Sequence, residues 1–218
     1  MSLKILYEDN HLIAVFKPAG LLVQGDETGD VCLMDEVKDY LKQKYNKPGK
    51  VFLGLLHRLD QPVSGIVLFA KTSKGASRLS EQFRNHTIQK TYHVLVEGVP
   101  VDEKGTLVHY LIKNKDTNVV KAYNEEKEGS LRAELDYEVE ESNGKVSLLK
   151  INLKTGRPHQ IRCQLAHMGH PIVGDMKYGS KQKHKNGEIA LCATSLVFET
   201  ATTKERKEIK NSPNFQFT

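Results

Sequence analysis

Residues 57–65 read His-Arg-Leu-Asp-Gln-Pro-Val-Ser-Gly and place one acid, Asp60, between the apolar runs 51–56 and 66–70. A carboxylate held in a fixed loop can serve as a nucleophile if it stays ionised. A guanidinium such as that of Arg58 at about 4 Å would contribute roughly 4 kcal/mol at an intermediate dielectric, before desolvation is subtracted. From this stretch alone, an ordinary Arg–Asp ion pair on a turn is the simpler interpretation.

A second polar stretch, residues 155–179, crowds cationic and polar side chains into the start of a predicted helix. These side chains are Arg157, His159, Gln160 and Arg162. A helix start that combines Arg side chains with free backbone N–H groups can bind phosphate, although a solvated polar face is the alternative. His159, His167 and His170 have no supporting Cys or carboxylate at a ligand spacing, so no metal is expected.

The charge of the chain is unevenly distributed. The net charge is +5, but residues 51–100 hold six Lys/Arg against three Asp/Glu and residues 151–200 hold seven against three. Residues 101–150 between them hold eight against eleven and are acidic. Because the two basic blocks also contain the two polar motifs, a polyanionic partner is indicated, with random surface scatter as the alternative.

Several features bear on the compartment. No stretch approaches the roughly 20 apolar residues that a membrane span needs, and the N-terminal residues show no secretion leader. Three widely spaced cysteines, Cys32, Cys163 and Cys192, suggest neither a disulfide framework nor a metal site. We therefore expect a cytoplasmic monomer with no membrane association.

The order of elements predicts an α+β fold, with a mixed, mostly antiparallel β-sheet and flanking helices, in a single domain over 1–218. Helices are predicted over 33–45, 73–85 and from 155–158 to Gly169, where Pro158 suits an early helical position. Asn143-Gly144 suits a tight hairpin turn. The polar tail 199–218 is expected to be loose. The predicted strands are 5–8, 11–17, 66–71, 90–98, 105–113, 118–123, 131–140, 145–154 and 189–198.

Four blocks in order resemble the RluA-type pseudouridine synthases. HRLDQPVSGIVLFAKT (57–72) is similar to their catalytic motif, and KTYHVLVEG (90–98) to their tyrosine motif. LKTGRPHQIRCQLAHMGHPIVGDMKYG (153–179) resembles their arginine motif, and ILYEDNHLIAVFKPAGLLV (5–23) their opening block. The resemblance implies the pseudouridine synthase catalytic fold, without the N-terminal S4 RNA-binding domain of many relatives.

The resemblance further implies isomerisation of uridine in structured RNA, in which the bond from C1′ to N1 is broken and C1′ is rejoined to C5. Asp60 would be the nucleophile, attacking either C1′ or C6, and Arg162 would pair with it and keep it charged. Tyr92 would stack on the flipped base and remove the C5 proton. Arg58 would hold the displaced nucleotide. No cofactor and no metal are implied.

The remaining RNA contacts are expected from residues 57–65, from residues 155–179 and from the basic loop 177–185. The substrate would be a tRNA or an rRNA stem-loop. The sequence departs from the family pattern at Pro62 and Val63, at Cys163 and Gln164 after the HQIR stretch, and at Gln24. The candidate RNA-binding residues are His57, Arg58, Arg157, His159, Gln160 and Lys177.

Two other functions are compatible with parts of the sequence. An RNA-binding protein with the same cleft but no chemistry would share the basic motifs. A glycoside or nucleoside hydrolase would need a second carboxylate at a defined separation, and neither basic motif offers an obvious one.

Overall fold

The computed structural model describes residues 3–27 and 29–217, and the chain divides into two compact units. Unit 1 comprises the residues up to Ile88 together with Ala193–Ser212. Unit 2 comprises Gln89–Cys192 and the residues from Pro213 onward. The expected single domain stays a prediction, and each unit is described by itself.

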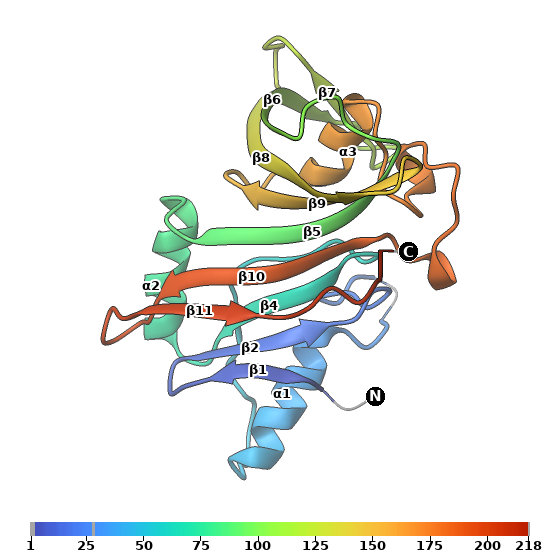
Figure 1. Ribbon diagram of the computed structural model, residues 1–218. Helices are drawn as coiled ribbons and strands as arrows, with labels where there is room; N and C mark the ends of the chain where they lie inside the picture. Colours follow the sequence, from blue (N-terminus) through green and yellow to red (C-terminus); the bar gives the residue numbers. More distant parts are fainter. Residues whose placement is uncertain (1–2, 28, 218) are drawn as a thin grey trace. The chain divides into compact units, whose positions relative to one another are not determined.

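Unit 1 is a sheet with two helices (Figure 1). Its strands follow the order β1-β2-β4-β10, with β3 beside β4 and β11 beside β10. The helices are α1 (Leu33–Lys44) and α2 (Ser73–Arg84). The strands are β1 (Ile5–Glu8), β2 (Leu12–Lys17), β3 (Gly54–Leu55), β4 (Ser64–Ala70), β10 (Leu191–Glu199) and β11 (Arg206–Lys210).

Along β2 and β4, successive side chains point alternately to the two faces of the unit 1 sheet. Leu12 and Ala14 share one face with Leu68, and α2 packs Leu79 against this face. The residues of β2 and β4 on the opposite face, such as Ile13 and Phe69, are buried as well. A strand that is covered on both sides reads as a continuous apolar run, and this explains the unbroken run at the end of the Asp60 motif.

Unit 2 is an antiparallel meander that carries one helix. Its strands follow the order β5-β9-β8-β6-β7. Asn143-Gly144 makes the tight turn between β8 and β9, and Gly144 takes the positive φ of 84° that such a turn requires. The elements are β5 (Gln89–Glu97), β6 (Lys104–Lys113), β7 (Val120–Tyr123), β8 (Leu131–Ser142), β9 (Val146–Leu153), α3 (Gln160–His167), η1 (Met176–Tyr178) and η2 (Lys185–Gly187).

Two expectations about local structure were wrong. The tail is not loose throughout, because β11 pairs antiparallel with β10 from Arg206 opposite Glu199 to Lys210 opposite Ser195. The last residue of that tail, Thr218, lies outside the described residues. The third helix does not start at Pro158 but at Gln160, since His159 has the left-handed φ of 49° and is the N-cap. In the described part of the chain, no helix is both long and apolar enough to span a membrane.

Candidate active site

The loop of Asp60 is a turn that leads directly into β4. The backbone N–H of Val63 donates to the carbonyl of Asp60 at 3.0 Å, and β4 begins one residue later. Val63 is buried, so the apolar residue that departs from the family pattern anchors the turn in the core. Arg58 is exposed, and among the described residues it forms no ion pair with Asp60. The simple turn pair considered from the sequence is therefore not formed.

A buried lysine ties this turn to the opening block. Lys17, at the end of β2, is fully buried, and its ammonium donates to the carbonyls of Pro18 (2.9 Å), Leu21 (2.7 Å) and Gln61 (3.0 Å). The N–H of Gly20 donates to Gln61 as well, at 2.8 Å. A buried charge is tolerated only where hydrogen bonds compensate it, so Lys17 fixes the residue next to Asp60.

His57 secures the other side of the Asp60 loop. Strand β3 pairs with β4 only at Gly54–Ala70 and Leu55–Phe69, and then leaves it. The Nε2 atom of His57 accepts the N–H of Leu68 at 3.0 Å. It takes the place of the backbone carbonyl that a longer β3 would have offered. The imidazole also stacks on Phe83 of α2, with ring centroids 4.9 Å apart. His57 thus positions the loop, and its predicted RNA contact stays a prediction.

The close packing of β10 against β4 explains why the residue after Ser64 is a glycine. A Cβ atom there would lie 2.4 Å from the backbone N and O atoms of Ala193 in β10. Its φ of 125° also falls in the region that side chains disfavour. The close approach of β10 requires a residue without a side chain.

Tyr92 lies on β5 opposite Ile151 of β9 and is largely buried. Lys90 precedes it by two residues and therefore shares its face of the strand. Burial lowers the pKa of the Lys90 ammonium, and its Nζ lies 3.6 Å from the position that a Cβ on Gly156 would take. Lys90 is a candidate for the site that the sequence reasoning missed.

A buried ion pair in unit 2 joins Arg162 of α3 to Asp175. The guanidinium donates from Nε to Oδ2 at 2.7 Å and from Nη2 to Oδ1 at 2.9 Å. The side chains are only 6% and 1% exposed. Arg162 is therefore buried, and the solvated polar face that was the alternative for this helix start does not describe it. Asp175, in the Gly-Asp-Met-Lys-Tyr-Gly stretch, was missed as a partner because nothing in its local sequence marks it as buried.

Tyr178 and His159 complete the surroundings of this pair. The guanidinium carbon of Arg162 lies 5.0 Å from the centre of the Tyr178 ring. The Tyr178 hydroxyl accepts the N–H of Val120 at 2.9 Å and lies 2.8 Å from Nδ1 of His159. Burial raises the pKa of Tyr178 to about 12. The ring and the carboxylate together fix the orientation of the guanidinium.

Gln160 serves the structure of the motif. Its Oε1 accepts from the Thr155 hydroxyl (2.8 Å) and from the Arg157 N–H (3.0 Å), and its Nε2 donates to the carbonyl of Glu134 (3.1 Å). The Nε of Arg157 donates to the carbonyl of Arg132 at 3.1 Å. The side chain of Gln160 is 3% exposed, so these bonds tie the loop to β8. An RNA contact from Gln160 stays a prediction that this burial does not favour.

The other two departures from the family pattern are buried in unit 2. Cys163 packs with Leu111, Val120 and Ala133 in a small apolar cluster. The Nε2 of Gln164 lies 3.2 Å from the carbonyl of Leu107 and 3.0 Å from Nδ1 of His109, so this residue joins α3 to β6. Both departures therefore lie in contacts between α3 and the neighbouring strands.

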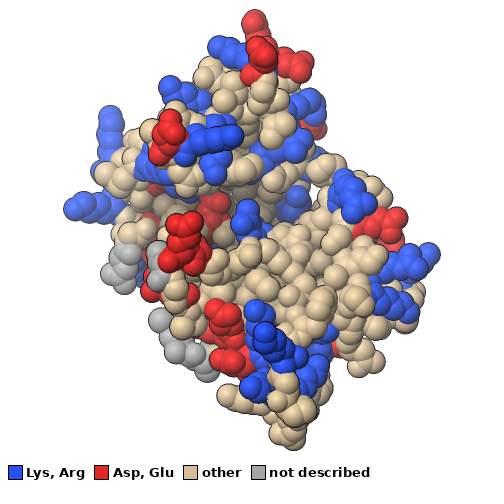
Figure 2. All heavy atoms as spheres, turned by 180° about the vertical axis from the view of Figure 1, so that it is seen from behind, with Lys and Arg blue, Asp and Glu red and all other residues tan. Residues whose placement is uncertain are grey.

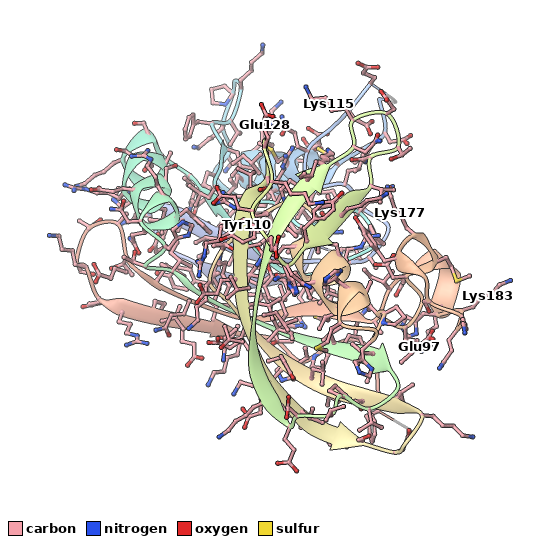
Figure 3. All side chains as sticks on the ribbon, turned by 90° about the horizontal axis from the view of Figure 1, so that it is seen from above. Glu97, Tyr110, Lys115, Glu128, Lys177 and Lys183 are labelled. Carbon is pink, nitrogen blue, oxygen red and sulfur yellow. The ribbon has the colours of Figure 1, made fainter. Side chains whose placement is uncertain are left out.

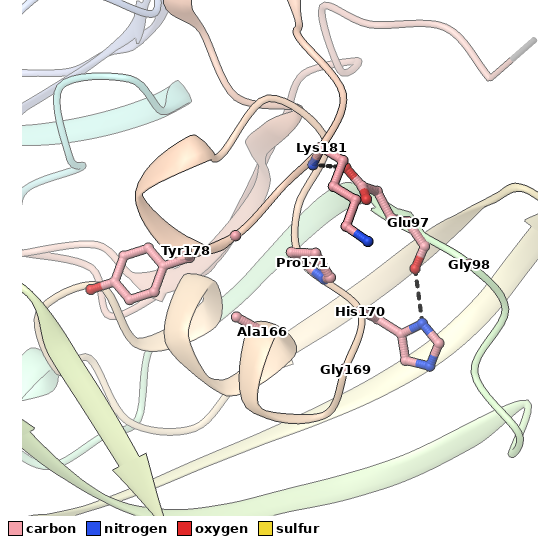
Figure 4. A pocket seen from close by; sticks show the side chains of 9 residues that line it. Glu97, Gly98, Ala166, Gly169, His170, Pro171, Tyr178 and Lys181 are labelled. Carbon is pink, nitrogen blue, oxygen red and sulfur yellow. Dashed lines mark hydrogen bonds between the residues drawn. The ribbon is translucent and has the colours of Figure 1, made fainter.

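The basic loop after α3 is anchored by Glu97 at the end of β5. One carboxylate oxygen of Glu97 accepts from the Ser180 hydroxyl (2.6 Å) and from the backbone N–H groups of Lys181 (2.8 Å) and Gln182 (3.0 Å). Glu97 lines a cavity of about 500 Å³, and its carbonyl lies 2.8 Å from Nδ1 of His170. Figure 4 shows Glu97 and His170 beside this cavity. The exposed Lys177 and Lys183 belong to this loop, and Lys183 extends outward from it (Figure 3).

Among residues 3–27 and 29–217, no group of three His, Cys, Asp or Glu side chains is arranged to hold a metal ion. Asp175 and Glu97 are each engaged by cationic or N–H donors.

The profile of a family described as RNA pseudouridylate synthase matches residues 11–167, which include the Asp60, Tyr92 and Arg162 motifs. The chain belongs to the RNA pseudouridylate synthase family. This membership identifies the chain as an isomerase that converts uridine in RNA to pseudouridine, as the sequence motifs predicted. The alternatives of a chemically silent RNA-binding protein and of a hydrolase are set aside.

Known pseudouridine synthases resemble the chain over most of its length. A tRNA pseudouridine synthase C from Vibrio parahaemolyticus is 34% identical over 97% of this chain and 91% of its own length. The enzyme of the same name from Salmonella typhi is 36% identical over 91% and 78%. The chain spans 57% of the length of a further such enzyme, from Pectobacterium carotovorum.

The fold comparison agrees with the predicted fold class. The solved structure of human RNA pseudouridylate synthase domain containing 4 covers 96% of this chain and is itself covered to 88%, with a TM-score of 0.80 and 23% identity. The solved structure of human RNA pseudouridylate synthase domain containing 1 has a TM-score of 0.77 and 23% identity. It covers 98% of this chain and is itself covered to 84%. The α+β pseudouridine synthase fold is thereby confirmed.

The structure groups the predicted site residues by unit. Asp60, Arg58 and His57 lie in unit 1, and Tyr92, Arg157, His159, Gln160, Arg162 and Lys177 lie in unit 2. The predicted pairing of Asp60 with Arg162 joins residues of different units and stays a prediction. Lys17, Lys90, Asp175 and Tyr178 were missed by sequence reasoning, although all four lie inside the motif blocks.

Proposed function

We propose that this synthase modifies uridine in tRNA and that Asp60 is the nucleophile. The observation that carries the assignment is the fixation of the Asp60 turn from both sides, by the ammonium of Lys17 at Gln61 and by His57 at Leu68. A nucleophile must be held close to its attack geometry before the substrate arrives, and the fixation of this turn from both sides supports that role for Asp60.

The chemistry needs one nucleophile, loss of a proton from C5 and gain of a proton at N1. The Asp60 carboxylate adds to the uridine at C1′ or C6, the bond between C1′ and N1 breaks, and the detached base turns. C1′ then bonds to C5, the C5 proton leaves, N1 gains a proton, and the carboxylate is released. Nothing is oxidised or hydrolysed, so the residues of this chain suffice for each step.

The other two assignments follow from this scheme. Tyr92 stacks on the flipped base, which returns roughly 1–3 kcal/mol of the unstacking cost, and it removes the C5 proton. The guanidinium of Arg162 keeps Asp60 ionised, since one opposite charge lowers a carboxylate pKa by about 1–3 units. Asp175 and Tyr178 support this role because they fix the orientation of the guanidinium.

Asp60→Asn tests the nucleophile. We expect no tritium release from C5-labelled uridine in transcribed RNA, with RNA affinity kept within about tenfold because phosphate contacts dominate affinity. Asp116→Asn, an exposed aspartate in unit 2, is the matched control and should release tritium normally. Undiminished release by Asp60→Asn would remove Asp60 from the mechanism.

The tRNA substrate is supported by the names of relatives such as those from Vibrio and Salmonella. Mapping pseudouridine in total RNA from cells with and without the gene should show one or a few tRNA sites that disappear. Loss of rRNA sites alone would reassign the substrate to rRNA without affecting the role of Asp60.

A further inference from the structure

Unit 1 carries a cavity of about 170 Å³ that none of the assigned roles uses. It lies beyond the C-terminal end of α1, next to the residues that follow β4. Its lining includes Leu41, Tyr45, Lys47, Phe52, Lys71 and Thr72. We call it the Tyr45–Phe52 cavity.

Two half-exposed aromatic rings line this cavity. Tyr45 is 46% exposed and Phe52 is 51% exposed. The Tyr45 ring is also fixed, because its hydroxyl donates to Glu8 at 2.6 Å and accepts from Lys71 at 3.0 Å. Single exposed aromatics are common on protein surfaces, whereas here two of them line the same cavity.

Ammonium groups surround the same ring. The Nζ atoms of Lys71, Lys44 and Lys47 lie 4.8, 5.6 and 5.9 Å from the centre of the Tyr45 ring. The segment 42–53 holds four lysines and no acid. Figure 2 shows Lys and Arg side chains gathered low on the drawn face, beside a group of Asp and Glu side chains.

Glu8 fixes two of these ammonium groups but does not neutralise the third. Its carboxylate accepts from Lys44 at 2.7 Å and from Lys71 at 2.6 Å. Among the described residues, no carboxylate lies within ion-pair distance of Lys47. An anionic ligand at the cavity therefore meets an excess of positive charge.

The Tyr45–Phe52 cavity is distinct from the place where uridine reacts. The Asp60 turn precedes β4, whereas Lys71 and Thr72 follow its last residue, Ala70. Seven residues at about 3.3 Å each separate the two ends by about 23 Å. A nucleotide in this cavity is not the one that is isomerised.

We propose that the Tyr45–Phe52 cavity binds an unpaired nucleotide of the substrate RNA, outside the modified uridine. Its base stacks between Tyr45 and Phe52, and its phosphate lies at Lys47. The inference rests on the RNA activity of the chain. Aromatic faces combined with cationic side chains are the arrangement that binds single-stranded RNA with little sequence preference.

Phe52→Trp provides a direct readout, because the chain contains no other tryptophan. We expect its fluorescence to be quenched by a short oligouridylate and by substrate RNA, with less quenching as salt is raised. Polyglutamate at equal charge concentration should not quench it. Stronger quenching by polyglutamate than by RNA would assign the cavity to an acidic protein partner and overturn the proposal.

Kinetics of Phe52→Ala and Lys47→Ala separate this cavity from the reacting site. Each should raise the KM for full-length RNA about tenfold and leave kcat unchanged, as expected for contacts made equally in ground and transition states. Val101→Ala, a 98% exposed residue of unit 2, is the control for Phe52→Ala. Lys115→Ala is the control for Lys47→Ala. Melting curves confirm that the variants are folded.

Unchanged KM in both variants together with no quenching would overturn the proposal. If wild-type protein released no tritium from any RNA, the proposed function would fail instead, and the quenching experiment would still decide whether the cavity binds RNA.

Discussion

The guanidinium of Arg162 and the carboxylate of Asp175 form two parallel hydrogen bonds, of 2.7 and 2.9 Å, in the interior of unit 2. Bidentate pairs of this kind fix orientation as well as charge. Removing one member of a buried ion pair typically costs about 3–5 kcal/mol.

Asp175→Asn should therefore lower the free energy of unfolding by about 3–5 kcal/mol in urea denaturation. Activity should fall as well, because the guanidinium loses its fixed orientation. Glu134→Gln is the control: Glu134 pairs with Arg132 in a partly exposed ion pair, whose loss should cost less than about 1 kcal/mol. Equal losses in the two variants would show that burial does not strengthen the Arg162 pair.

Arg162→Met should abolish tritium release, since Asp60 would lose the cation that the proposed mechanism requires. Arg132→Met, which removes an exposed guanidinium of the same unit, should leave the rate near normal. A normal rate in Arg162→Met, measured on folded protein, would show that the nucleophile needs no such partner.

His57→Ala distinguishes a positioning role from an RNA contact. The variant leaves the N–H of Leu68 without its acceptor, which should cost about 1–3 kcal/mol of stability. If His57 positions the Asp60 turn, kcat should fall and the KM for RNA should equal that of the wild type. A rise in KM with unchanged kcat would instead support the direct RNA contact predicted from the sequence.

Gly65→Ala should lower the free energy of unfolding by at least about 3 kcal/mol, because the new Cβ meets the Ala193 backbone and the φ of 125° is strained. Gly49→Ala is the matched control, with no atom within 4 Å of the added Cβ, and should change stability by no more than about 1 kcal/mol. Thermal melting of both variants makes the comparison. A tolerated Gly65→Ala would mean that β10 can move away from β4.

Glu97 should make the stability of unit 2 dependent on pH. Burial alone would raise the pKa of Glu97, but the hydrogen bonds from Ser180, Gln182 and Lys181 outweigh burial and lower it. The folded state then binds the proton less readily than the unfolded chain. The stabilising contribution is complete above the unfolded pKa of about 4.3 and is lost as the pH falls through the lower folded value.

The measurement is the difference in unfolding free energy between wild type and Glu97→Gln as a function of pH. It should be largest near pH 7 and shrink below about pH 4. Glu103→Gln controls for the loss of an exposed carboxylate. A difference between wild type and Glu97→Gln that is constant down to pH 3 would contradict the anchoring role of Glu97.

Much of the fold and of the chemistry was predictable from local patterns. Alternation and helical spacing identified most strands and all three helices, because each element must present an apolar face to the core. The Asp60, Tyr92 and Arg162 motifs identified the family, since the residues of each motif lie close together in the chain. The confirmed activity follows from these motifs.

Tertiary structure alone decided which groups meet across long separations in the chain. Strand β11 is polar apart from Ile209, and it pairs with β10 while Ile209 packs into the core of unit 1. Asp175 lies 13 residues from Arg162, and Lys17 lies 44 residues from Gln61. His57 accepts the backbone N–H of Leu68, which β3 is too short to pair with. No periodicity encodes such pairs, because burial of a polar group can be compensated by a partner from any part of the chain.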